Sequence, residues 1–71
     1  MAKIITNPEI MLGKPIIRGT RITVEIILRK LSEGANFEDI LKMYPNITIE
    51  DIYVAIDYAA NTIANEEILA A

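Results

Sequence analysis

Three consecutive segments of this chain repeat their apolar residues at helical spacing, and each lies between residues that start and stop a helix. The first repeats them at i, i+3, i+4 and i+7, the spacing of one buried stripe: Val24, Ile27, Leu28 and Leu31. Thr23 is suited to cap this helix at its start, and Gly34 to follow its end in a left-handed conformation. The pattern predicts a helix that begins after Thr23 and ends near Glu33.

The next two segments are organised in the same way. Asn36 and Thr48 are the expected N-caps, and Pro45 stops the second helix. The second stripe consists of Phe37, Ile40, Leu41 and Tyr44, and the third of Ile49, Ile52, Ile56, Ala59 and Ile63. We therefore predict three helices of roughly 10, 8 and 20 residues, the last running to about residue 68. A short helix, a tight turn and a longer helix form a helix-turn-helix.

Two short β-favouring runs precede the helices. Residues 3–6 end at Asn7-Pro8, and residues 16–18 lie between Pro15 and Gly19. These strands pair either with each other or with their copies in a second subunit. The predicted fold is a single, mainly α domain over residues 1–71. It has a β arm (1–22) and a three-helix helix-turn-helix bundle (23–68).

The chain has few means of stabilising so small a fold by itself. A domain of about 70 residues buries only about 60% of its unfolded surface, and its 71 residues include no Cys and no His. Disulfides and the commonest metal ligands are thereby excluded. Apolar residues make up 52% of the sequence, more than one small core needs. We therefore expect a homodimer.

No run approaches the roughly 18–20 apolar residues of a membrane helix, so no membrane association is expected. Asn7-Pro8 comes too early for a signal-peptide core. These features favour a cytoplasmic protein.

The residue types present in the chain also argue against catalysis. Without Cys or His there is no nucleophile–imidazole pair and no obvious base near neutral pH. Adjacent carboxylates such as Glu38-Asp39 and Glu50-Asp51 point about 100° apart on a helix, and they suit its first turn electrostatically. We expect no enzyme activity and no catalytic, cofactor-binding or metal-binding residues.

Charge is sorted along the sequence. Residues 1–31 hold six cations and two carboxylates, whereas residues 32–71 hold one cation and eight carboxylates. The outward face expected for the third helix carries Glu50, Val54, Asp57, Tyr58 and Asn61, with Asp51 at its margin. Because that face has no cation, it is poorly suited to a DNA groove. A better nucleic-acid surface is the basic set formed by Lys14, Arg18, Arg21 and Arg29, unless these cations pair with the acidic helix.

Surplus apolar residues indicate protein partners. Ile26, Val54 and Tyr58 lie opposite the predicted buried stripes, and exposed apolar patches with aromatics are typical of interfaces. Ile16 and Ile17 on the second strand would help to assemble the dimer. Ile68 and Leu69 near the end of the third helix could dock into a partner's groove.

The run from Gly13 to Ile22, with Gly13, Pro15, Gly19, Thr20 and Arg21 at its fixed positions, resembles the small prokaryotic family called domain of unknown function 433. Tyr44-Pro45 and Ala59-Ala60 extend the similarity to nearly the whole chain. The resemblance implies a homeodomain-like, usually dimeric fold and an antitoxin-like role beside a PIN-like toxin. We therefore expect a regulatory protein-binding module of a toxin–antitoxin system. The alternative is a DNA-binding autoregulator that uses the basic arm, and a small hydrolase is the least supported hypothesis.

Overall fold

The computed structural model describes the backbone of residues 3–70 and the side-chain surroundings of residues 3–65. Its elements, in chain order, are strands β1 (Ile4–Ile5) and β2 (Ile16–Ile17), the single turn η1 (Met11–Gly13) between them, and helices α1 (Val24–Ser32), α2 (Phe37–Met43) and α3 (Ile49–Ala70). The prediction of a mainly helical chain with three helices and a short β arm is confirmed. Within the described residues, no helix is both long and apolar enough to cross a bilayer.

The two strands pair with each other inside one chain. They are antiparallel, with Ile4 opposite Ile17 and Ile5 opposite Ile16. Arg18 extends the ladder by donating its backbone N–H to the Lys3 carbonyl at 2.7 Å. This arrangement decides between the two pairings that the sequence left open.

Each helix begins where its cap predicts. The Thr23 hydroxyl accepts from the Ile26 N–H at 3.0 Å, and Asn36 forms a reciprocal capping box with Asp39. Thr48 and Asp51 form a second box, with bonds of 3.2 and 2.9 Å. These contacts satisfy N–H groups that have no partner inside the helix.

The end of α1 also follows its sequence signal. Gly34 lies at φ +102°. Its N–H donates to the Leu31 carbonyl at 3.1 Å, and the Ala35 N–H donates to the Lys30 carbonyl at 3.0 Å. This pair of bonds is a Schellman motif, which turns the chain from α1 into α2.

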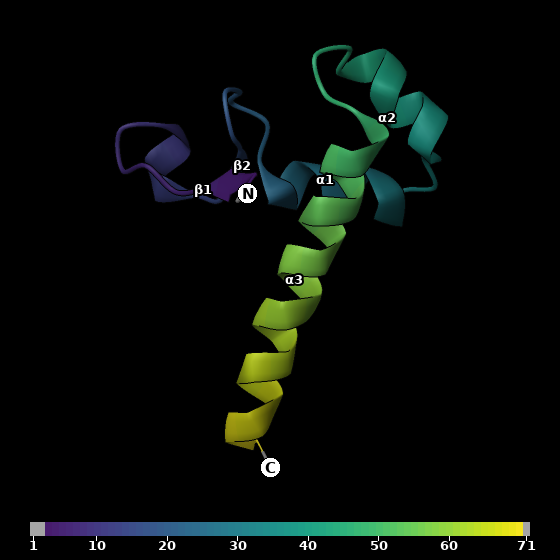
Figure 1. Cartoon of the computed structure of the whole chain (residues 1–71). Coiled ribbons are helices and arrows are strands. Elements are labelled where there is room, and N and C mark those ends of the chain that lie inside the picture. Colours follow the sequence, from purple (N-terminus) through teal and green to yellow (C-terminus); the bar gives the residue numbers. More distant parts are fainter. Residues whose placement is uncertain (1–2, 71) are drawn as a thin grey trace.

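The core is built mainly from isoleucine. Its buried members come from the arm and from all three helices: Ile17, Ile22, Val24, Ile27, Ile40, Ile47, Ile52 and Ala55. Helix α1 crosses the first half of α3, α2 lies beyond the N-terminal end of α3, and the arm extends to one side (Figure 1). The second half of α3 projects from this body as a separate rod (Figure 1).

The predicted stripe of α3 is only partly correct. Ile52 is fully buried and Ile56 and Ala59 pack against the core, but Ile49 and Ile63 are 45% and 55% exposed. The body covers only the middle of the stripe, so residues near its two ends remain in solvent. Asp51 was placed at the margin of the outward face and is instead 9% exposed, because its carboxylate bonds back to Thr48 at the helix start.

Candidate protein-interaction surface

The β1–β2 connection presents an apolar side chain on a strained backbone. Met11 and Leu12 have φ values of +51° and +58°, followed by Gly13 at +80°. Non-glycine residues pay roughly 1–2 kcal/mol each for this conformation. In this conformation the Leu12 side chain lies in solvent with 92% of its surface exposed, and the neighbouring Met11 is 41% exposed. The combination of a strained backbone and a large exposed apolar residue makes this turn a candidate interaction site.

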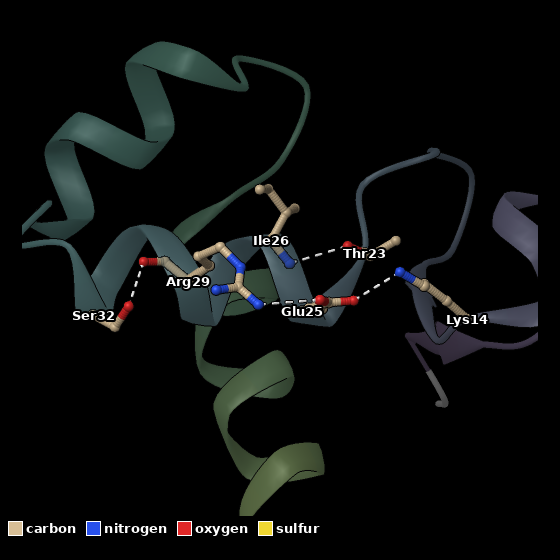
Figure 2. Close-up of polar contacts among 6 residues, drawn as sticks. All are labelled: Lys14, Thr23, Glu25, Ile26, Arg29 and Ser32. Carbon is tan, nitrogen blue, oxygen red and sulfur yellow. Dashed lines mark hydrogen bonds and ion pairs between the residues drawn. The ribbon is translucent and has the colours of Figure 1, made fainter.

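A chain of ion pairs runs along the outer edge of α1. The Lys14 ammonium lies 2.9 Å from one oxygen of Glu25, and the Arg29 guanidinium lies 3.3 Å from the other (Figure 2). We call these three residues the ion ridge. The hydrogen bond from Lys14, then that from Arg29, lowers the pKa of the Glu25 carboxyl, so the carboxylate stays charged between its two cations.

On one side of the ion ridge lies a basin of about 340 Å³. Its apolar lining includes Met11, Ile26 and Tyr44, and its cations are Lys14, Arg21 and Arg29. Glu25 is the one carboxylate among the residues that line the basin. The basin therefore combines an apolar floor with an excess of positive charge, which suits a partner that is apolar and acidic.

A groove of about 470 Å³ lies between α1 and α3, and it shares Glu25 and Arg29 of the ion ridge with the basin. Val24 and Leu28 line it from α1, and Tyr58, Ala59, Thr62 and Ile63 line it from α3. Tyr58 and Ile63 are 37% and 55% exposed. The groove is thus an open, mainly apolar surface that continues onto the projecting half of α3.

The structure brings three of the four predicted nucleic-acid residues together. Lys14, Arg21 and Arg29 line the basin, but Glu25 pairs with Lys14 and Arg29. Arg18 lies apart on the turn after β2 and is exposed. Within the described part of the chain, the ion pairs include neither Arg18 nor Arg21. Among the described ion pairs, none of these four cations contacts the acidic helix; that contact is made by Lys3 instead, which lies 3.8 Å from Glu50 and from Asp51.

Two residues that the sequence predicts at an interface, Ile16 and Ile17, are buried within the single chain. Ile16 and Ile17 are 1% and 3% exposed: both pair with β1 within the chain, and Ile17 also packs in the hydrophobic core. They hold the arm to the core and offer no surface to a partner.

The other predicted interface residues have varied positions. Ile26 is half-buried and lines the basin. Val54 is half-buried, and Tyr58 lies in the groove and not on the far face of α3. The side chains of Ile68 and Leu69 lie outside the described residues.

Sequence reasoning missed Met11, Leu12 and the exposure of Ile63. Gly13 marks a turn, but Met and Leu have no preference for a left-handed backbone, so no local signal identified their conformation. The exposure of Ile63 depends on where the body ends along α3, which periodicity does not reveal.

Comparison with known proteins assigns the chain to a family. Residues 4–59 match the family described as "Protein of unknown function (DUF433)". The chain belongs to this family.

Two relatives extend the comparison. A crystal structure of a DUF433 member from Anabaena variabilis superposes with a TM-score of 0.79 at 30% sequence identity, covering 97% of this chain and 69% of that one. The uncharacterized protein y4eO of Sinorhizobium fredii is 33% identical over 54 residues. These residues are 76% of this chain but only 24% of y4eO, so the chain spans about a quarter of that relative. The resemblance seen in the sequence is confirmed, and the family carries no described activity.

Proposed function

We propose that this DUF433 protein is a non-enzymatic regulatory module that binds a second protein, in the manner of an antitoxin that restrains a PIN-like toxin. One observation carries the proposal: Leu12 stands in solvent on a strained turn beside a basic basin. Leu12 supplies an apolar anchor, and Lys14 and Arg21 at the basin supply positive charge. A PIN-like nuclease holds its metal with clustered carboxylates, so its active-site rim has the complementary charge.

The proposal predicts that a PIN-like nuclease is encoded beside this chain, and that nuclease is the test partner. Calorimetry measures the complex, and the ribonuclease rate measures its effect. Leu12→Asn should weaken binding at least about tenfold, the loss expected for an interface anchor. The matched control is Ile49→Asp, which changes a 45% exposed apolar residue at the start of α3, away from the basin. Equal affinity of the Leu12 variant and the parent chain would contradict the proposed surface.

The alternative function is a DNA-binding autoregulator. It is favoured by Arg18 and Arg21, which are exposed and stand outside the ion pairs of the described residues. In this alternative the arm contacts phosphates. Insertion of α3 as a recognition helix, the homeodomain-like arrangement, is disfavoured because residues 49–65 carry three carboxylates and no cation.

A further inference from the structure

The basin contains two cations that already share one oxyanion. The Glu25 carboxylate lies between the Lys14 ammonium, at 2.9 Å, and the Arg29 guanidinium, at 3.3 Å (Figure 2). All three side chains are at least half exposed, and exposed ion pairs of this kind contribute little to stability. An anion from solution can therefore replace Glu25 between the same two cations without any change in the core.

The charge of the basin matches a dianion. Arg21 also lines it and stands outside the ion pairs of the described residues. Among the described residues, three cations and one carboxylate line the basin, which leaves an excess of two positive charges. A phosphomonoester carries a charge of about −1.5 to −2 near neutral pH, and its oxygens suit the paired donors of a guanidinium. The basin therefore fits a phosphomonoester better than a carboxylate.

The apolar floor of the basin indicates what the phosphate is attached to. Ile26 and Tyr44 are half-buried there, and the left-handed turn that exposes Leu12 adds Met11. A methionine thioether packs well against aromatic rings. The volume of about 340 Å³ is near the lower end of small-molecule sites, which span about 300–1,000 Å³. Inorganic phosphate alone would leave this floor uncovered, whereas a small aromatic body would cover it.

We propose that the basin binds a small aromatic phosphomonoester, the chemical class to which the nucleoside monophosphates belong. The phosphate takes the place of the Glu25 carboxylate beside Lys14 and Arg29 and also contacts Arg21, while the aromatic body lies on the apolar floor. Glu25 is thus a built-in competitor of the ligand. The site is tested on this chain alone, so it does not depend on the function proposed above. Only one consequence rests on that function: a bound ligand would exclude the protein partner from Lys14 and Arg21.

Nuclear magnetic resonance titration of the isotope-labelled chain, in a buffer free of phosphate, tests the ligand class. The probes are adenosine monophosphate and phenyl phosphate, which differ in the size of the aromatic body. At least one should bind with a dissociation constant below about 1 mM and shift resonances of the basin residues. Adenosine and inorganic phosphate, added separately, should each bind at least about tenfold more weakly than adenosine monophosphate or phenyl phosphate, whichever binds tighter.

Two variants test the role of the ion ridge. Lys14→Gln and Glu25→Gln break the same ion pair but change the charge of the basin in opposite directions. Lys14→Gln should weaken binding about three- to fivefold, and Glu25→Gln should tighten it by a similar factor. The matched control is Glu33→Gln, which removes an exposed carboxylate that pairs with Lys30 outside the basin and should leave the affinity unchanged. Arg18→Ala should also leave it unchanged, which separates this site from the DNA-binding alternative.

The results that overturn the proposal are equally specific. Dissociation constants above about 1 mM for both probes exclude the ligand class. Equal affinity for inorganic phosphate excludes the apolar floor, and equal affinity for adenosine excludes the cations. If Glu25→Gln weakens binding as Lys14→Gln does, the ligand needs the intact ion pair and Glu25 is not its competitor. If Glu33→Gln tightens binding as much as Glu25→Gln, the effect is one of overall charge, and the basin is not the site.

Discussion

At the scale of single residues, Leu12 is the position where stability and exposure most clearly conflict. A leucine in a left-handed conformation costs free energy, and its side chain gains no burial in return. Asn adopts this conformation more readily than other non-glycine residues because its short side chain can hydrogen-bond locally. Leucine at this position therefore suits a side chain that becomes buried only in a complex.

Leu12→Asn should raise the free energy of unfolding by about 0.5–1 kcal/mol, since it relieves part of the backbone cost and removes no core contact. Urea denaturation followed by circular dichroism measures this change. Gly13→Ala provides the opposite control, because a Cβ at φ +80° is strained, and it should lower stability. A loss of stability in the Leu12 variant would show that its side chain supports the fold.

At the scale of secondary-structure elements, the helix boundaries were predictable, whereas the part of the α3 stripe that becomes buried was not. Thr23, Asn36 and Thr48 identify helix starts because a cap is satisfied by residues within one turn of it. Which part of a stripe is buried depends on the length of the helix that crosses it. Helix α1 has nine residues and α3 has 22, so the body covers the middle of the α3 stripe and leaves Ile49 and Ile63 exposed.

The candidate surface could be predicted only in part. The basic residues of the basin were recognised from their positions in the sequence, as was the surplus of apolar residues. The Lys14–Glu25 ion pair was not predicted because it connects the arm to α1 through the folded chain, whereas Arg29–Glu25 is a local i, i+4 pair within α1. The left-handed turn at Met11 and Leu12 was missed for a different reason, since it opposes the intrinsic preference of both residues.

The two capping boxes provide an internal comparison at this scale. Asp39 and Asp51 occupy equivalent positions in α2 and α3, but Asp39 is exposed whereas Asp51 is 9% exposed and also lies 3.8 Å from Lys3. Asp51→Ala should therefore lower the free energy of unfolding by about 1–2 kcal/mol, and Asp39→Ala by about 0.5–1 kcal/mol. Thermal and urea unfolding of both variants checks the order. Equal losses would mean that burial and Lys3 add nothing to the cap.

At the scale of the whole molecule, the sorted charge of the sequence is only partly paired between its two halves. Lys3 pairs with Glu50 and Asp51, and Lys30 pairs with Glu33, whereas Glu25 holds Lys14 and Arg29 within the basic half itself. Arg18 and Arg21 stand outside the ion pairs of the described residues. Phosphate binding depends on cations that are available to replace counterions, so these two arginines carry the DNA-binding alternative.

The DNA-binding alternative gives a distinct set of salt dependences. If the arm binds duplex DNA, Arg18→Ala and Arg21→Ala should each flatten the log–log salt slope by about one unit. Glu25→Gln should steepen it by up to about two units, because it releases Lys14 and Arg29. Fluorescence anisotropy across a salt series measures the slope, with Lys42→Ala at the exposed end of α2 as the control. Unchanged slopes in Arg18→Ala, Arg21→Ala and Glu25→Gln would eliminate the alternative.

The position of β1 also has a consequence for how the protein is made in the cell. Ile4 packs against the core and Lys3 contacts Glu50 and Asp51, so the arm finds partners among residues that are translated much later than itself. Translation adds about 5–20 residues per second, and long-range contacts form only after both segments have emerged. The arm must therefore wait for α3, and this fold reaches its native state only when the beginning of α3 is outside the exit tunnel.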